Sequence, residues 1–195
     1  MRIGRSEGFN MGIGTRRITG TWLVDDNGVV QRGDFLLNED GSASPSKGDE
    51  DVLEVIDGST RLVTRSMQNW HTHMAMVLNK SMGEGLPLME WLETSIFPVE
   101  KKLTEEFVEA GTRAAAAEMI ATGTTFACDM YYHPDVVGRV LVESGIRAKV
   151  CGPITDFPTP SYPDGPGQAL RMIESLLAEG SPGQGRVDYG IGTHS

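Results

Sequence analysis

The feature that most restricts the fold of this chain is a regular alternation of helix-like and strand-like segments after residue 60. The clearest helix is expected over 104–122, where Thr104 can cap the first turn and Gly123 can follow the last. In chain order we expect strand 61–68, helix 88–100, helix 104–122, strand 124–130, helix 134–144, strand 147–154, helix 168–178 and strand 187–192. Strands that alternate with helices predict a parallel sheet covered by helices, and so an α/β fold.

The first sixty residues follow a different pattern. Short β-like runs are separated by the sequences DDNG, NEDG and DG, whose glycines suit tight turns. The runs cover 18–24, 29–37 and 52–56. We therefore predict a small antiparallel β domain over residues 1–60 and a separate α/β domain over 61–195.

Composition limits the class of protein. Hydrophobic residues make up 39% of the chain and charged residues 23%, which is typical of a globular domain. A formal net charge of −10 disfavours binding to nucleic acid or to an anionic membrane. The two cysteines do not make a disulfide scaffold, residues 1–17 lack the apolar core of a secretory signal, and no apolar run approaches the ~20 residues of a membrane helix. We expect a soluble, cytoplasmic protein.

Polar residues with metal-binding or catalytic chemistry follow three of the expected strands. His71 and His73 end the first strand, Asp129 ends the second and His194 follows the last. The carboxyl ends of parallel strands meet at one edge of a sheet, where the active sites of α/β barrels lie. The pattern therefore predicts a site at this edge.

The sequence His71-Thr72-His73 has two interpretations. Side chains two residues apart on a strand point to the same side, so both imidazoles can reach one ion. A histidine at a strand end can equally be a hydrogen-bonded structural residue. Zinc takes three or four protein ligands, so a pair alone is incomplete. The spacing by itself leaves both interpretations open.

Longer motifs around this pair resemble one known family. They are NWHTHMAM at 69–76, LPLMEWL at 86–92, PVE at 98–100, DMYYH at 129–133 and GIGTHS at 190–195. At these spacings the chain resembles the amidohydrolase superfamily, especially the deaminases of S-adenosylhomocysteine and 5′-methylthioadenosine and the related chlorohydrolases. The resemblance is close over 60–195 and loose before it.

The resemblance implies a fold and a set of site residues. The chain would form about the first half of a (β/α)8 TIM barrel, preceded by part of a small β-sandwich. His71 and His73 would bind one catalytic zinc, or another divalent transition metal. Trp91 would line a nucleoside pocket, Glu100 would accept hydrogen bonds from ribose hydroxyls, and His194 would hydrogen-bond the purine.

Without the resemblance, other interpretations stand for several of these residues. Trp91 would be a packed aromatic side chain and Glu100 a solvated carboxylate at a helix end. Asp129 and His133 fit a turn and a loop, and we assign neither a role in the site.

The function implied is hydrolytic deamination of an adenine nucleoside thioether, a small-molecule partner. The family's third zinc histidine, its glutamate acid/base, another histidine and a zinc-binding aspartate would lie beyond Ser195, so we assign no catalytic residue to this chain. Two departures from the family occur: Arg65-Ser66 replaces proline-glycine, and 151–167 lacks the arginines that bind an amino-acid carboxylate. A triazine chlorohydrolase, a guanine-type deaminase and a non-catalytic remnant that binds a ligand or partner remain alternatives, and a homo-oligomer is left open.

Overall fold

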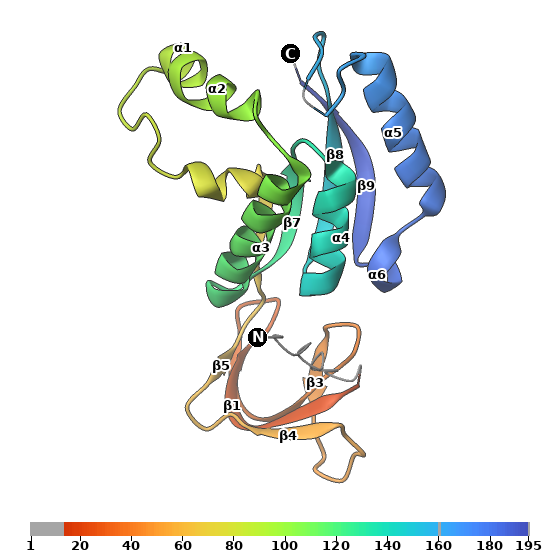
Figure 1. Cartoon of the computed structure of the whole chain (residues 1–195). Coiled ribbons are helices and arrows are strands. Elements are labelled where there is room, and N and C mark those ends of the chain that lie inside the picture. The colour runs from red at the N-terminus through yellow and green to blue at the C-terminus, as the bar shows by residue number, and fades with distance from the viewer. Residues whose placement is uncertain (1–13, 160, 195) are drawn as a thin grey trace, which may run out of the picture. The chain divides into compact units, whose positions relative to one another are not determined.

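The structure, a computed structural model, describes residues 14–159 and 161–194. The chain divides into two compact units, Met1–Arg65 and Ser66–Ser195 (Figure 1). The sequence placed this boundary at residue 60; the structure places it later because a short strand just after that residue belongs to the first unit. The expectation that residues 1–17 are no secretory signal falls mostly on residues outside the described part.

The first unit is a single five-stranded sheet. Its strands are β1 (Arg16–Val24), β2 (Val30–Leu37), β3 (Ala43–Pro45), β4 (Glu54–Asp57) and β5 (Leu62–Val63). The β1–β2 hairpin turns as predicted: the Asp25 carboxylate accepts hydrogen bonds from the backbone of Asn27 and Val29, and Gly28 has a φ of 78°. Ile18 and Phe35 are buried and form its small core.

The prediction of a purely antiparallel domain was wrong in part. β1, β2 and β3 pair antiparallel, but β4 and β5 both pair parallel to β1. The chain returns from β3 to the far edge of β1 through a long connection, so β4 runs in the same direction as β1. Turn motifs in the sequence describe only hairpins and give no sign of such a return.

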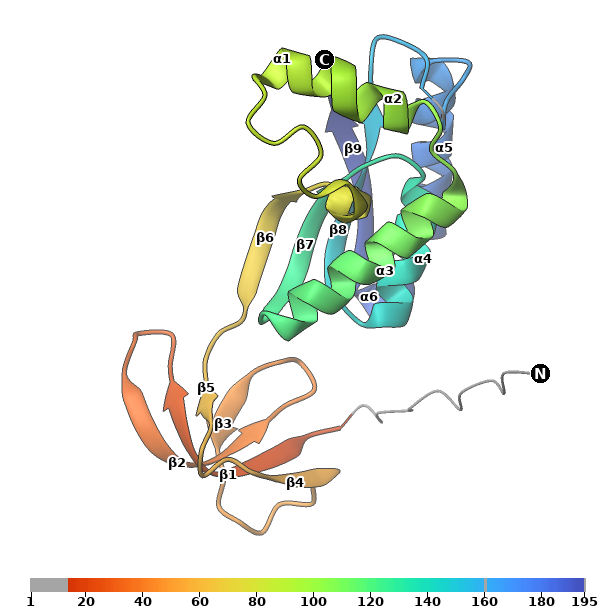
Figure 2. The same ribbon diagram turned by 60° about the vertical axis from the view of Figure 1, so that its left-hand side comes forward.

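The second unit is a four-stranded parallel sheet with helices on one face (Figures 1 and 2). The strands are β6 (Met67–Thr72), β7 (Thr124–Met130), β8 (Arg147–Ile154) and β9 (Val187–Thr193), in the spatial order β6-β7-β8-β9. The covering helices are α3 (Glu105–Ala121), α4 (Pro134–Ser144) and α5 (Pro166–Glu179). The alternation of strand and helix thus produces the predicted parallel sheet.

Short helical segments complete this unit. They are the 3-10 helix η1 (Met74–Asn79), α1 (Leu88–Trp91), the π-helical turn η2 (Leu92–Ile96), α2 (Phe97–Glu100) and α6 (Pro182–Gly185). The expected helix over 88–100 is therefore continuous but not regular, since a π turn separates α1 from α2. The expected strand over 61–68 is two strands, β5 and β6, one in each unit.

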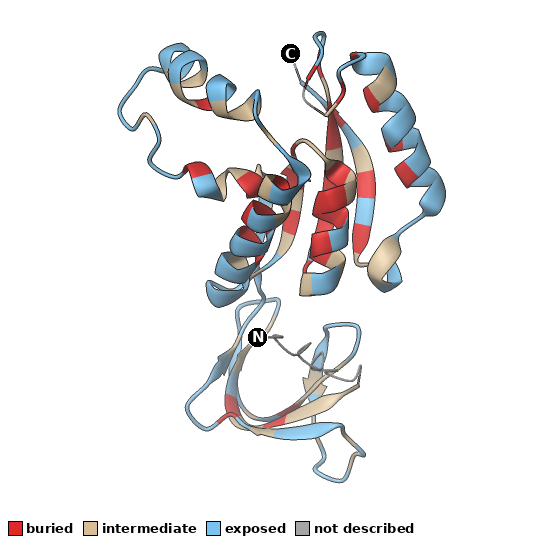
Figure 3. Ribbon diagram, in the orientation of Figure 1, coloured by how far each residue is buried: buried red, intermediate tan, exposed pale blue. Residues whose placement is uncertain are grey.

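The core lies between the sheet and its helices, where the buried residues gather (Figure 3). Ala127 on β7 and Val150 on β8 are fully buried, as are Val108 on α3 and Val137 and Leu141 on α4. The ends of α3 follow the predicted signals: the Thr104 hydroxyl accepts from the backbone of Phe107, and Gly123 follows with a φ of 83°. This packing fixes the carboxyl ends of β6 and β7 beside each other.

Candidate metal and substrate site

The paired histidines lie at the carboxyl end of β6, as predicted. His71 is exposed and His73 is half-buried. The centroids of the two imidazole rings are 5.4 Å apart and the rings are nearly perpendicular, at 82°. The two rings are close enough to converge on a single ion with ligand bonds of ~2.0–2.1 Å, the usual zinc–nitrogen distance.

A hydrogen bond sets the chemistry of the His73 ring. Its Nδ1 lies 2.6 Å from the backbone carbonyl oxygen of Met130, at the end of β7. Because a carbonyl oxygen can only accept, Nδ1 carries the proton and the neutral ring has its free lone pair on Nε2. Metal-binding histidines commonly have this arrangement, which fixes the tautomer and the ring orientation.

Asp129 comes just before Met130 and is completely buried. Its Oδ1 accepts a hydrogen bond of 2.6 Å from the backbone N–H of Met74, the residue after His73. Burial raises the pKa of the Asp129 carboxyl to about 7, and the Met74 N–H partly opposes this shift. From the sequence alone Asp129 is assigned no role in the site, although a carboxylate within an apolar strand is a signal that could have identified it.

Glu100 reaches the same end of the sheet from α2. The Tyr131 hydroxyl donates a hydrogen bond of 3.1 Å to Glu100 Oε1, and the Tyr131 ring centroid is 6.2 Å from that of His73. Burial raises the pKa of the Glu100 carboxyl, while the hydrogen bond from Tyr131 lowers it. Tyr131, which sequence reasoning overlooked, therefore connects Glu100 to the histidine pair.

The remaining two predicted residues are less closely tied to the histidines. Trp91 is half-buried, and its indole N–H donates to the backbone oxygen of Met82 at 2.7 Å, so its contacts are with the loop before α1. His194 is exposed beyond β9, where its backbone N–H donates to the oxygen of Ile154 at 2.9 Å. The structure thus brings Glu100 near His73 and gives no side-chain contact between Trp91 or His194 and the pair.

The donors present fit part of a zinc site. Over residues 14–159 and 161–194, no group of three or more histidine, cysteine, aspartate or glutamate side chains is placed to hold a metal ion. His71 and His73 offer imidazole nitrogens from one strand end, with the His73 tautomer already fixed. They can supply two ligands, and zinc needs at least one more.

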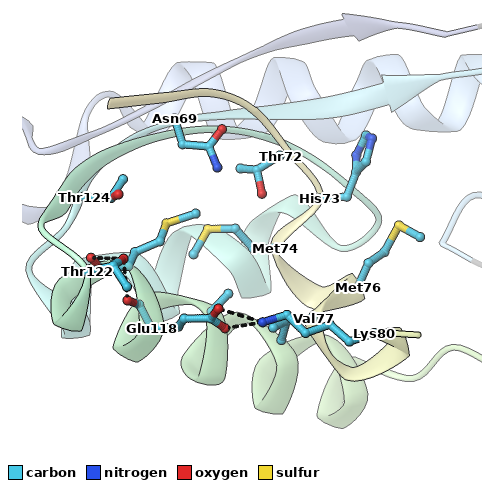
Figure 4. A pocket seen from close by; sticks show the side chains of 12 residues that line it. Asn69, Thr72, His73, Met74, Met76, Val77, Lys80, Glu118, Thr122 and Thr124 are labelled. Atoms are coloured by element: carbon cyan, nitrogen blue, oxygen red, sulfur yellow. Dashed lines mark hydrogen bonds and ion pairs between the residues drawn. The ribbon is translucent and has the colours of Figure 1, made fainter. Parts of the chain in front are cut away.

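A hollow of about 420 Å³ opens beside this strand end (Figure 4). It lies between β6, η1 and α3, and its walls are mainly apolar. Its lining includes His73, Met74, Met76, Val77 and Met119, with the Lys80–Glu118 ion pair on one side. The hollow extends from His73 to Thr122 and Thr124 near the start of β7, so it continues well away from the histidine rings.

Comparison with known proteins agrees with this geometry. Residues 63–195 match the model of the amidohydrolase family. The chain belongs to this family. A curated relative, 5-methylthioadenosine/S-adenosylhomocysteine deaminase from Syntrophobacter fumaroxidans, is 43% identical over 138 residues, which are 70% of this chain and 31% of the relative. Its counterpart from Thermococcus kodakarensis is 34% identical over 175 residues, covering 89% of this chain and 41% of the relative.

A solved structure shares the fold. An adenosine deaminase from Xanthomonas campestris with bound zinc superposes with a TM-score of 0.83 at 26% identity, covering 92% of this chain and 42% of that one. The chain therefore spans less than half the length of the proteins it matches. The expected fold class, an α/β partial barrel with part of a small β domain, is confirmed. None of the helices in the described residues is both long and apolar enough to span a membrane.

Proposed function

We propose that the complete protein containing this chain is a zinc-dependent hydrolytic deaminase of an adenine nucleoside thioether. Candidate substrates are S-adenosylhomocysteine, 5′-methylthioadenosine and adenosine. The observation that carries the proposal is a pair of hydrogen bonds made by adjacent residues at the end of β7: the Met130 carbonyl oxygen accepts from His73, and the Tyr131 hydroxyl donates to the Glu100 carboxylate. Deaminase names among the curated relatives support the substrate class. Both cysteines are free, which supports a reducing, cytoplasmic location.

The residues of this chain would bind the metal, the ribose and the purine. Zinc, when bound, makes a strong nucleophile available from water at neutral pH. His71 and His73 would hold the metal through imidazole nitrogens. Glu100, when ionised, would accept hydrogen bonds from the ribose hydroxyls, Trp91 would lie against the nucleoside, and His194 would donate to the purine. Water would add to the ring carbon that carries the amino group, and ammonia would leave.

The proton transfers and the remaining zinc ligands would come from parts of the protein outside this chain. General acid–base catalysis is typically worth ~10²–10⁴ in rate. We therefore expect the 195-residue chain alone to bind zinc weakly and to show no measurable deamination. Metal analysis and the fall in ultraviolet absorbance of an adenine nucleoside measure the two properties. A tight zinc site and turnover comparable to that of the complete protein would contradict the proposal.

The histidine pair is tested in the complete protein. Replacing His71 or His73 by alanine should remove most of the bound zinc and most of the activity. His133→Ala is the matched control, because His133 follows the neighbouring strand β7, at the N-cap of α4, and is no proposed ligand. Equal zinc content in His71→Ala, His73→Ala and wild-type protein would refute the metal site.

The role of Glu100 is tested by comparing substrates. Glu100→Ala should lower kcat/KM on a ribosyl substrate about 10²-fold, as expected for the loss of hydrogen bonds to a charged acceptor, and should affect the free base much less. Glu100→Gln keeps the shape of the side chain and one acceptor oxygen. Its kcat/KM on the ribosyl substrate should lie between those of the wild type and Glu100→Ala. An equal loss on nucleoside and free base would remove the ribose role.

A further inference from the structure

Two consecutive residues at the end of β7 hold two consecutive residues after β6. The Met130 carbonyl oxygen accepts from His73 Nδ1, and Asp129 Oδ1 accepts from the backbone N–H of Met74, both at 2.6 Å. One bond fixes an imidazole and the other fixes the backbone next to it. The turn that carries His73 is thus attached to β7 at two adjacent points.

Asp129 supplies an acceptor that the local sequence lacks. His73 precedes the 3-10 helix η1 at its N-cap position, but its side chain makes no capping hydrogen bond. The N–H of Met74, at the start of η1, would need another partner, because a buried donor without one costs about 1–3 kcal/mol. Asp129 provides that partner, which leaves the His73 ring available to bond to Met130 instead.

Asp129 lies on the buried side of β7, where a carboxyl group lowers the stability of the fold because it loses its hydration. Asp129 has the same orientation on β7 as Ala127, and both are fully buried. A carboxyl group at such a position loses its hydration, and only one of its two oxygens has a partner among the described residues, since Oδ2 has none. An apolar residue would pack there without this cost, so the core alone does not explain the carboxyl group.

We propose that Asp129 is a positioning residue for the metal-binding pair. It acts through Met74: by fixing the backbone after His73, it holds the His73 ring in the orientation in which Nδ1 faces Met130 and Nε2 is available to the metal. It does not bind the metal itself. This inference rests on the proposed function, because it assigns Asp129 to the same site. Loss of such an outer contact typically costs 10–100-fold in metal affinity.

The test is made in the complete protein and uses Asp129→Ala, which removes the acceptor, and Asp129→Asn, which keeps an acceptor of the same shape. Thr112→Val is the matched control, because Thr112 is also fully buried and its hydroxyl has no partner among the described residues. Three quantities are measured for each variant: zinc affinity by competition with a chromogenic chelator, the tautomer of His73 by imidazole nitrogen NMR, and the unfolding temperature.

We expect Asp129→Ala to weaken zinc binding 10–100-fold and to replace the single His73 tautomer by an average of two. Asp129→Asn, which keeps the contact, should lose less than about 10-fold in zinc affinity, and Thr112→Val should change neither quantity. If Asp129→Ala lowers the unfolding temperature while zinc affinity and the His73 spectrum stay unchanged, Asp129 is only structural and the inference is overturned. Asp129→Val, which suits a strand, replaces Asp129→Ala if the latter does not fold.

Failure of the proposed function gives a different result. In that case the His71→Ala and His73→Ala variants of the complete protein would bind zinc as the wild-type complete protein does, whatever residue stands at 129. The His73 tautomer can be measured without metal, so the hold of Asp129 on that ring is still tested. If the metal-free Asp129→Ala protein still shows a single His73 tautomer, the inference is overturned.

Discussion

The carboxyl ends of the strands carry predicted site residues in very different surroundings on the two sides of the sheet, at β6 and β7 on one side and at β9 on the other. At the β6–β7 end, Asp129 is fully buried, His73 is bonded to Met130, and Tyr131 donates to Glu100. At the β9 end, Thr193 and His194 are exposed, and His194 is held through its backbone N–H, which donates to the oxygen of Ile154. Both ends carry residues of the family motifs described above. A motif therefore identifies a site residue without showing whether the surrounding chain fixes its side chain.

The largest expected effect is a pH dependence that belongs to the β6–β7 end. In metal-free protein the folded state keeps a proton on Asp129 up to about pH 7, whereas the unfolded state loses it near 3.8. Between these values the unfolded state binds fewer protons, so the free energy of unfolding falls as the pH rises, by at most about 4 kcal/mol. Denaturant unfolding at pH 5 and 7.5 should show this fall in wild-type protein and a smaller one in Asp129→Asn. Identical pH dependence in both would contradict the assignment.

The next largest expected effect is a loss of stability when a methyl group is added at a closely packed glycine. A Cβ at Gly111 on α3 would lie 2.4 Å from the backbone oxygen of Ala75 in η1, so Gly111→Ala must push the two segments apart. We expect a loss of about 1–3 kcal/mol in the free energy of unfolding. Gly190→Ala on β9 is the control: its nearest neighbour would be the end of the flexible Lys149 side chain, at 2.9 Å from Cε, which can move. A loss in Gly190→Ala as large as in Gly111→Ala would remove the contrast between the two ends.

A smaller effect is expected from Tyr131→Phe. This change removes the hydrogen bond to Glu100 and should lower the free energy of unfolding by about 1 kcal/mol. It also removes the interaction that lowers the pKa of Glu100. The pKa of Glu100 should therefore rise further above its usual value. Carboxyl carbon NMR of Glu100 measures the shift. Tyr132→Phe, whose ring lies 5.2 Å from that of Tyr131, should leave the pKa of Glu100 nearly unchanged.

The smallest effect is expected at His194. Because its side chain is exposed, His194→Ala should change the free energy of unfolding by less than about 0.5 kcal/mol. Denaturant unfolding of the 195-residue chain measures this. A loss above about 1 kcal/mol would show that the β9 end is held as firmly as the β6–β7 end.

Local patterns predicted the elements well. Thr104 and Gly123 marked the ends of α3, and the apolar runs marked β7, β8 and β9, because caps and strand periodicity depend on neighbouring residues. The position of the two histidines at a strand end followed in the same way.

What the sequence could not give were the contacts between distant segments. The His73–Met130 and Met74–Asp129 bonds join residues 57 and 55 positions apart. No spacing rule relates such residues until the pairing of β6 with β7 is known. For the same reason Asp129 resembled a turn residue and the parallel pairing of β4 with β1 was missed.

The π-helical turn Leu92–Ile96 lies between Trp91 and Glu100 and gives this segment an unusual tolerance of the loss of one residue. A π turn accommodates one more residue than an α-helical turn, and each residue rotates a helix by about 100°. Deleting one residue here would convert the π turn into a regular turn and leave Glu100 on about the same face of the helix, whereas the same deletion from a regular helix would rotate all that follows by about 100°. We therefore expect a one-residue deletion within Leu92–Ile96 to keep the Glu100–Tyr131 hydrogen bond and one within α3 to disturb the residues that follow it.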